Sequence, residues 1–174
     1  MKTSIQARGE AVAWLATSEF AEAKPTLIDS STEEFSAGWV YYQSALFLRT
    51  NNFQHMLVGN APIFIPRNGA QPEVISYHRP TSESAAAFLY CGTANAKPNA
   101  EIELRGWKEG ACKASASQAI RVYSSLGLLA AHTAIHHCLV GQAIRIKTTN
   151  VVAARQRVSN LEELGFIFCI TYGA

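Results

Sequence analysis

The hydrophobic pattern is sharpest in the middle of the chain, at residues 63–65 (Ile-Phe-Ile). Pro62 and Pro66 flank this apolar run, and a Gly-Asn pair precedes it at residues 59–60. Because a proline interrupts helical hydrogen bonding, a helix cannot pass through this stretch. The pattern therefore predicts a short buried strand, entered through a turn.

Two neighbouring segments are expected to pair with this strand. Residues 67–69 (Arg-Asn-Gly) are typical of a turn, so residues 73–77 are expected to return antiparallel to the central run. Residues 38–44 (Gly-Trp-Val-Tyr-Tyr-Gln-Ser) are rich in the aromatic and β-branched side chains that favour strands. Alternation places Trp39, Tyr41 and Gln43 on one face of that strand. A shorter strand is expected to begin at residues 26–28.

Helices are predicted on either side of these strands. The first covers residues 4–18 and has an apolar face at helical spacing, made of Ile5, Val12, Leu15 and Ala16. The second runs from Thr81 to about Tyr90, with Thr81 or Ser82 as its cap.

The second half of the chain gives a clearer order of elements. Strands are predicted at residues 101–107, 143–147 and 166–172. Two helices, the first capped by Ser115 or Ser117, follow the first strand and meet at a Leu-Gly-Leu corner. A third helix, capped by Asn150, lies between the last two strands. The order is β-α-α-β-α-β.

These elements predict an α+β protein of two domains. Residues 93–100 contain small residues and one proline without periodicity, which is typical of a linker. We therefore expect one domain at residues 1–92 and another at 101–174.

Composition favours a folded protein with a covered surface. Of its 174 residues, 48% are hydrophobic and only 16% are charged, fewer charges than in an average soluble domain. Residues 1–95 carry six basic and eight acidic side chains, a net charge of −2, whereas residues 96–174 carry nine basic and five acidic, a net charge of +4. The opposite signs indicate two units with separate faces.

The cysteines and the N-terminus indicate a cytoplasmic protein. The four cysteines are scattered and are expected to be reduced and mostly buried: Cys91, Cys112, Cys138 and Cys169. The N-terminal segment is no secretory signal, and no apolar run approaches the roughly 20 residues of a membrane span. We expect no membrane partner.

The histidines are the only candidates for a metal site. His132 and His136 share a helix face and could bind zinc with a third group, with His137 and Cys138 beside them. The same residues also suit the polar border of an apolar stripe, and a His-Glu-x-x-His pattern is missing. We expect no metal and no cofactor, and the role of this cluster stays open.

No catalytic constellation is visible. The chain has no Gly-x-Ser-x-Gly elbow and no glycine-rich phosphate loop. Only the fold could bring Cys91 or Cys112 near His55 or His78. We therefore predict that the protein is not an enzyme.

Basic residues of the second half could bind RNA or an acidic partner: Arg121, Arg145, Lys147, Arg155 and Arg157. Aromatic residues are not interleaved among them as a base-stacking surface requires. A solvated face is the favoured interpretation, and nucleic acid is not an expected partner.

The first half resembles the YrhB-like group of bacterial proteins, also called the immunity-protein-35 family. The resemblance is carried by the first helix, by Ser-Ala-Gly-Trp at residues 36–39, and by Gly-Asn-Ala-Pro-Ile-Phe-Ile at residues 59–65. It implies neutralisation of a cognate toxin from a polymorphic toxin system. The family also includes a stand-alone member regarded as chaperone-like.

The second half is similar to the C-terminal domain of the bacterial ribosomal stalk protein, which has a ClpS-like fold. The resemblance rests on residues 118–121 (Gln-Ala-Ile-Arg) and on the Leu-Gly-Leu corner at 126–128. In that family, lysines on the first two helices bind translation factors. Leu129 and His132 stand where lysines are expected, so the resemblance implies the fold more than factor binding.

If the protein is an immunity protein, five residues are candidates for contact with a toxin: Asp29, Glu33, Glu34, Trp39 and Tyr41. The three carboxylates could mimic nucleic-acid phosphates and cover the basic groups of a nuclease toxin. Aromatic residues are frequent interface anchors. A solvated acidic loop and a core tryptophan are the alternative interpretations.

The sequence leaves several functional hypotheses. The first is a cytoplasmic immunity protein that binds a cognate protein toxin, a nuclease among the possibilities, without chemistry. The alternative is a ribosome-associated, translation-factor-associated or chaperone-like binding module. An enzyme or metalloprotein built on the histidine helix is the third. Neither the oligomeric state nor the toxin follows from the residues.

Overall fold

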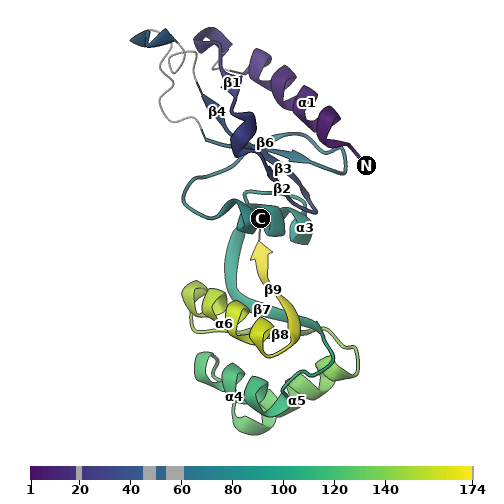
Figure 1. Cartoon of the computed structure of the whole chain (residues 1–174). Coiled ribbons are helices and arrows are strands. Elements are labelled where there is room, and N and C mark those ends of the chain that lie inside the picture. Colours follow the sequence, from purple (N-terminus) through teal and green to yellow (C-terminus); the bar gives the residue numbers. More distant parts are fainter. Residues whose placement is uncertain (19–20, 45–49, 54–60, 174) are drawn as a thin grey trace. The chain divides into compact units, whose positions relative to one another are not determined.

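A computed structural model describes residues 1–18, 21–44, 50–53 and 61–173. It divides the chain into two compact units, unit 1 (Met1–Ala96) and unit 2 (Lys97–Gly173). Both combine helices with antiparallel strands, which confirms the predicted α+β class (Figure 1). The turn predicted at residues 59–60 lies outside the described residues.

Unit 1 is built on a four-stranded antiparallel sheet. Its strands are β2 (Glu33–Glu34), β3 (Gly38–Tyr41), β5 (Ile63–Pro66) and β6 (Glu73–Val74), in that order. The pairing of β5 with β6 confirms the predicted central hairpin. A separate two-stranded sheet joins β1 (Thr26–Leu27) to β4 (Gln43–Ser44). Two short 3-10 helices, η1 (Ala21–Ala23) and η2 (Asp29–Ser31), flank β1.

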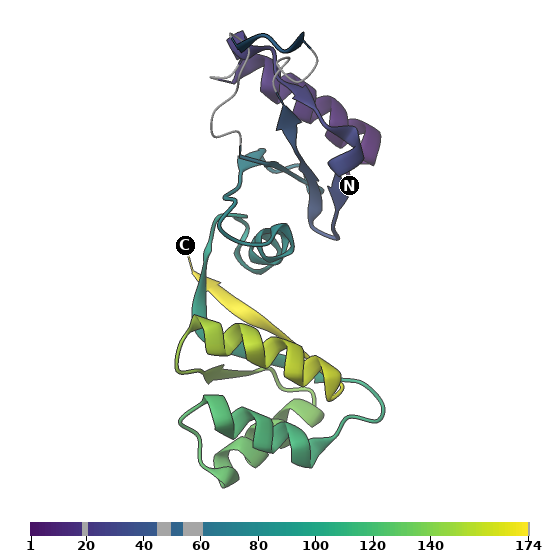
Figure 2. The ribbon, with the colours of Figure 1, turned by 60° about the vertical axis from the view of Figure 1, so that its left-hand side comes forward.

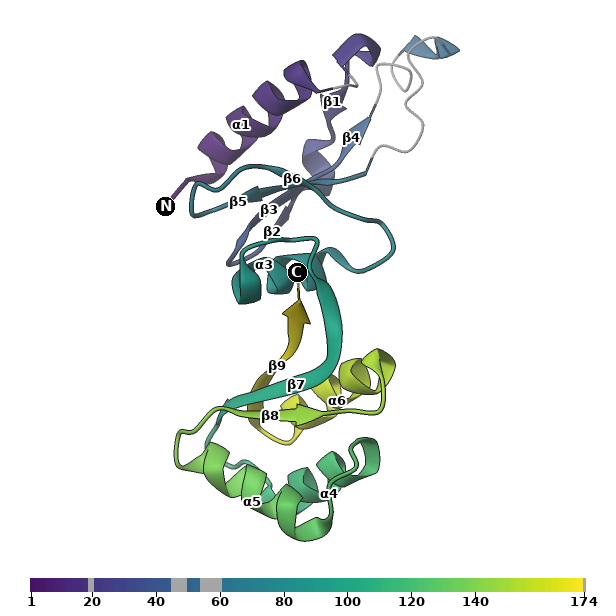
Figure 3. The ribbon, with the colours of Figure 1, turned by 180° about the vertical axis from the view of Figure 1, so that it is seen from behind.

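Helices cover both faces of this sheet (Figure 3). Helix α1 (Ser4–Thr17) packs against Trp39, Tyr41, Ile63 and Ile65. Helix α3 (Thr81–Cys91) packs against the opposite side, where Val40 and Phe64 are buried. Every residue of β3 and β5 is therefore buried. The continuous apolar run predicts this for β5, whereas the burial of β3 on both faces follows from the two helices.

The structure corrects the face by which α1 packs. The buried residues are Ala7, Ala11 and Leu15, whereas Ile5 is 83% and Val12 is 46% exposed. The sheet face beneath the helix already carries Trp39 and Tyr41. Small side chains let the helix approach these bulky rings, so tertiary packing outweighs the apolar stripe expected from the sequence.

Glycine at position 38 permits the close pairing of β3 with β5. Gly38 lies opposite Pro66 in the register. A Cβ added there would lie 2.2 Å from the carbonyl oxygen of Ile65. Because that neighbour is backbone, it cannot move aside cheaply.

The caps of two helices differ from prediction. Pro80, without a side-chain cap, precedes α3, and the Thr81 hydroxyl instead donates to Glu33. Cys112 precedes α4 (Lys113–Tyr123), so Ser115 and Ser117 lie inside that helix. The prediction was right for α6 (Val151–Glu163), where the Asn150 side chain accepts from the backbone N–H of Ala153.

Unit 2 has the predicted β-α-α-β-α-β order (Figure 2). It consists of β7 (Lys97–Trp107), α4, α5 (Leu128–Leu139), β8 (Ile144–Lys147), α6 and β9 (Phe166–Gly173). Its sheet has the order β8-β7-β9. One face carries the core, which includes Ile102, Leu104 and Ile146 together with buried residues of all three helices.

Part of the expected linker is regular structure. Strand β7 begins at Lys97, inside the segment 93–100. Residues 93–96 are tied to unit 1, because Glu73 accepts hydrogen bonds from Thr93 and Ala94, and Arg79 donates to the carbonyl of Ala96. Small residues at this position mark a tightly held segment followed by a strand.

Candidate binding surface of unit 1

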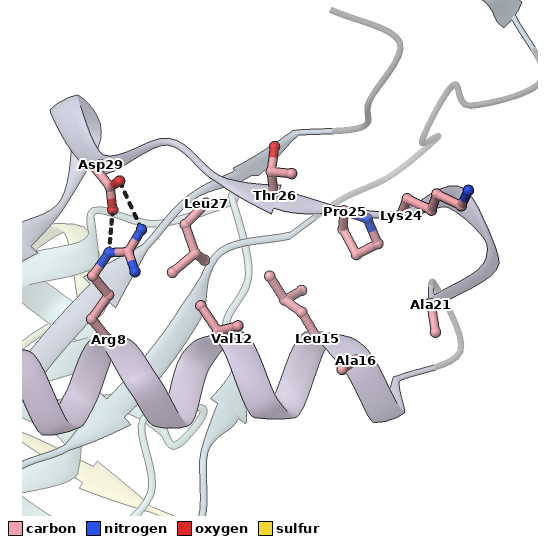
Figure 4. Close-up of a pocket in the computed structure, with 10 residues that line it drawn as sticks. All are labelled: Arg8, Val12, Leu15, Ala16, Ala21, Lys24, Pro25, Thr26, Leu27 and Asp29. Carbon is pink, nitrogen blue, oxygen red and sulfur yellow. Dashed lines mark hydrogen bonds and ion pairs between the residues drawn. The ribbon is translucent and has the colours of Figure 1, made fainter. Parts of the chain in front are cut away.

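A surface pocket lies between helix α1 and the segment that contains η1 and β1 (Figure 4). Its volume is about 570 Å³. Apolar side chains form most of its wall, from Val12, Leu15 and Ala16 of α1 and from Ala21, Pro25 and Leu27 of the facing segment. Arg8 and Asp29 stand at one end of the pocket and Lys24 stands near the other.

Arg8 and Asp29 form a two-pronged ion pair. Arg8 Nε donates to Asp29 Oδ1 at 2.8 Å, and Nη2 donates to Oδ2 at 3.0 Å. The hydrogen bond lowers the pKa of Asp29 and raises that of Arg8. Since this geometry fixes both side chains, Asp29 is presented in one orientation although it is solvent-exposed.

Glu33 lies on strand β2, and two hydroxyl groups from other elements hold its carboxylate. The Tyr42 hydroxyl donates to Oε1 and the Thr81 hydroxyl to Oε2, both at 2.6 Å. The bond to Glu33 raises the pKa of Tyr42. Glu33 thus connects its strand to the start of α3, and within the described part of the chain it pairs with hydroxyl donors and with no cation.

Glu34 belongs to a stack of three groups. Arg67 Nη2 donates to Glu34 Oε1 at 2.6 Å and to the carbonyl of Phe35 at 3.2 Å. The Arg67 guanidinium carbon also lies 4.0 Å from the centre of the Trp39 ring, a cation–π contact. The Glu34 side chain is 61% exposed, so its carboxylate faces solvent while Arg67 holds it in place.

Trp39 and Tyr41 lie beneath this surface. Trp39 is 1% and Tyr41 is 3% exposed, in accord with the core interpretation of the tryptophan. The Tyr41 hydroxyl donates to the carbonyl of Ser4 at 3.3 Å, and burial raises its pKa. Both rings join α1 to the sheet, and the carboxylates rather than the rings face solvent.

A comparison with models of protein families assigns the chain to one family. The model of a family described as immunity protein 35 matches residues 6–109, more than half of the chain. The chain belongs to the immunity protein 35 family. No curated protein and no solved structure matches it. The family match includes α1, the sheets of unit 1, α3 and strand β7.

The pocket of this immunity protein offers mainly an apolar wall. Among the described residues that line it, Thr26 carries a hydroxyl group and none is a histidine or a cysteine. Its charged groups at one end are already joined as an ion pair. An apolar anchor of a partner fits such a wall, and the ion pair offers polar contacts at the entrance.

One strained residue borders the pocket. Lys24 has a φ of +49°, in the left-handed region that non-glycine residues seldom adopt. Its backbone N–H donates to the carbonyl of Ala21 and closes the short helix η1. The strained turn places Lys24 on the pocket rim.

Three cations at this surface were not among the sequence candidates: Arg8, Lys24 and Arg67. Arg8 is separated from Asp29 by 21 positions, and Arg67 from Glu34 by 33. No sequence periodicity spans such distances. In the structure, Arg8 and Arg67 are revealed by their pairing with carboxylates on neighbouring elements, and Lys24 by its place in the pocket lining.

The histidine candidates do not converge. His132, His136 and His137 are exposed on α5, whereas Cys138 is buried. Across the described residues, no group of three or more His, Cys, Asp and Glu side chains could hold a metal ion. The described helices include none long and apolar enough to cross a membrane.

The other chemical candidates are also dispersed. Cys91 lies on α3 and Cys112 at the start of α4, and His55 is outside the described residues. Arg121, Arg145, Lys147 and Arg155 are exposed. Arg157 is 1% exposed and belongs to the interior of unit 2, so the predicted basic face is smaller than expected.

Proposed function

We propose that this protein neutralises a cognate toxin of a polymorphic toxin system by binding it without chemistry. The binding surface would combine the pocket beside α1 with an acidic rim, defined as Asp29 and Glu34. Membership of the immunity protein 35 family is the observation that carries the proposal. We place the encounter in the cytoplasm.

The negative charges of the acidic rim favour binding of a toxin with a basic surface, such as a nuclease. Arg8 and Arg67 hold Asp29 and Glu34 in place. Glu33 was a candidate from the sequence, but it bonds to Tyr42 and Thr81 on the α3 side of the sheet and lies outside this rim. Pre-positioned carboxylates can meet phosphate-binding cations of a nuclease at little further entropic cost. Trp39 and Tyr41 would contribute from below, by fixing Arg67 and α1.

The pocket supplies the apolar part of such an interface. Val12 is 46% exposed at its wall, and Ile5 is 83% exposed on the same helix. A buried anchor surrounded by charged groups is the usual arrangement of a tight interface. An apolar side chain of the toxin would enter here.

Co-expression tests the function directly. The toxin encoded beside this protein would be expressed in a sensitive bacterium with and without it. The proposal expects survival only in the presence of the protein. Equal killing in both strains removes it, provided that the immunity protein accumulates in soluble form.

Matched variants test the surface. Val12→Asp is expected to weaken toxin binding by at least about tenfold, because it places a charge in the apolar wall. Ala13→Asp, exposed on the same helix and outside the pocket, should bind as the wild type does. If calorimetry gave equal affinities for the two variants, the pocket would not be part of the interface.

The acidic rim has its own control. Glu34→Lys is expected to slow association and to weaken its dependence on salt. Glu109→Lys makes the same change of net charge at an exposed position of unit 2 and should leave association unchanged. Stopped-flow measurements at two salt concentrations distinguish these outcomes.

For unit 2 we propose only a fold similar to the stalk C-terminal domain. The β-α-α-β-α-β order and the corner at residues 126–128 support it. Leu129 and His132 are exposed where that family has lysines. Comparison of an experimental structure of unit 2 with the stalk domain would test this.

A further inference from the structure

Strand β8 forms one edge of the sheet in unit 2. It pairs on its inner side with β7, in the register Glu103↔Arg145 and Glu101↔Lys147. Within the described ranges, no strand pairs with its outer side. The backbone of β8 therefore presents an edge to which another strand could add.

The hydrogen-bond pattern shows which residues serve that edge. The backbone N–H of Thr148 donates to the carbonyl of Ala100 at 2.8 Å. In an antiparallel ladder, hydrogen-bonded and non-bonded pairs alternate. Residues 144 and 146 therefore bond to β7, and the N–H and C=O groups of Arg145 and Lys147 point outward.

An apolar groove runs along this edge. Its volume is about 450 Å³, and α5 and β8 supply most of its lining. Leu129, Ala130 and Thr133 line it on the helix side, and Ile144 and Ile146 on the strand side. Leu129 is 80% exposed, so an apolar surface continues from the strand edge onto the helix.

The other face of β8 carries positive charge. Arg105 and Arg145 share one carboxylate, that of Glu103, at 2.7 Å and 3.1 Å. Lys147 is exposed beside them. The Arg145 side chain is 61% exposed, so an acidic group on an added strand could reach it.

The inner neighbour of β8 shows what the outer edge should accept. Residues 101–104 of β7 read Glu-Ile-Glu-Leu. Their glutamates lie opposite Arg145 and Lys147, and their apolar residues lie opposite Ile144 and Ile146. A strand with the same alternation would place apolar side chains in the groove and acidic ones beside the basic face.

We propose that the outer edge of β8 and its groove bind an extended segment of a partner protein in which acidic and apolar residues alternate. The segment adds antiparallel to β8 as a fourth strand. A second copy of this chain does not fit, since two antiparallel β8 strands would bring Arg145 and Lys147 of both copies onto one face. This proposal is independent of toxin binding by unit 1.

A synthetic peptide tests the proposal on the full chain. The peptide Gly-Glu-Ile-Glu-Leu-Glu-Ile-Gly, labelled with fluorescein, is expected to bind saturably in anisotropy measurements. A peptide with lysine in place of each glutamate should bind at least about tenfold more weakly. Amide hydrogen exchange at Arg145 and Lys147 should slow when the acidic peptide binds.

N-methylated peptides test the strand geometry. The amides of the glutamates face β8, because these residues lie opposite Arg145 and Lys147. Methylation of the glutamate amides should abolish binding, whereas methylation of the isoleucine and leucine amides should leave it unchanged. Equal binding of the two methylated peptides would overturn strand addition.

Variants of the protein test the groove and its charge. Leu129→Glu should weaken binding about tenfold, because it places a like charge in the apolar wall. Leu128→Glu, also exposed on α5 but outside the groove, should bind normally. Lys147→Glu should reverse the preference in favour of the lysine peptide.

Two outcomes would overturn the proposal outright. One is the absence of saturable binding of the acidic peptide at up to about 1 mM. The other is dimerisation in sedimentation experiments that Leu129→Glu removes and Leu128→Glu does not, which would assign the groove to a second copy.

Discussion

The two units use antiparallel sheets in different ways. In unit 1, helices α1 and α3 cover both faces of the four-stranded sheet, and every residue of β3 and β5 is buried. In unit 2, the helices cover one face, and the other carries Glu103, Arg105 and Arg145. Both sheets have edge strands, but a sheet covered on both sides leaves no face for partners, whereas a sheet covered on one side offers one.

The difference is already present in the strand sequences. The run Ile63-Phe64-Ile65 is continuously apolar because a helix covers each face of its strand. Residues 101–104 alternate because one side meets the core and the other meets solvent. Four sets of measurements would test whether the two sheets differ in this way.

Adjacent core substitutions should have the largest effects. Phe64→Ala and Ile65→Ala are each expected to lower the free energy of unfolding by about 3 kcal/mol or more, since both side chains are 0% exposed. In unit 2, Phe166→Ala should cost a similar amount, but Ile167→Ala, at a residue 46% exposed, about 1 kcal/mol or less. Urea denaturation would measure all four. A small effect of either substitution in β5 contradicts burial on both faces.

Two glycines of unit 1 should respond in opposite directions. Gly38→Ala is expected to cost about 2–3 kcal/mol, because the new methyl group would lie 2.2 Å from the carbonyl oxygen of Ile65. Gly9→Ala meets no atom within 4 Å and lies inside α1, so it should stabilise the protein by up to about 1 kcal/mol. Denaturant midpoints of the two variants provide the measurement. Equal destabilisation would show that β3 and β5 are less closely paired.

The open face of unit 2 should show in the pH dependence of stability. Burial would raise the pKa of Glu103, but hydrogen bonds from Arg105 and Arg145 outweigh it and hold the pKa below 4.5, its ordinary value. The stabilisation is therefore present above about pH 4.5 and is lost as the pH falls through the folded-state pKa. Glu103→Gln should cost on the order of 1 kcal/mol at neutral pH and less in acid.

Melting temperatures measured from about pH 3 to about pH 7, a range that includes the ordinary carboxyl pKa, would test this. Asp29→Asn in unit 1 is the comparison, because the pKa of Asp29 is also lowered but its side chain is 59% exposed. Its effect should be the smaller one. A Glu103→Gln curve parallel to that of the wild type at every pH contradicts the prediction.

Cysteine reactivity should give the smallest effects. A hydrogen bond with Ser115 lowers the pKa of Cys112, whereas burial raises the pKa of Cys138 and Cys169. At neutral pH, Cys112 should react with iodoacetamide fastest and Cys138 slowest. Ser115→Ala should slow Cys112 alone, with the exposed Cys91 of unit 1 as an internal control. Mass spectrometry of timed samples would measure the rates, and unchanged labelling of Cys112 would contradict the effect of Ser115.

Local pattern was enough to predict most elements. The α+β class, the β5–β6 hairpin, the order of elements in unit 2 and the Asn150 cap all follow from residues close together in the chain. Each depends on periodicity, turn chemistry or a cap, which act over a few positions. Membership of the immunity protein 35 family likewise agrees with the motifs around Trp39 and residues 59–65.

Neighbouring residues in the chain were enough to predict the buried run of β5, the alternation of β7 and the order of elements in unit 2, because these depend on periodicity and turn chemistry. The fold was needed to show that β3 is buried on both faces, that α1 packs by Ala7 and Ala11, that Arg8 holds Asp29, and that Arg67 lies between Glu34 and Trp39. These contacts join residues far apart in the chain. They depend on the shapes of packed side chains and on the path of the backbone, which no local pattern specifies.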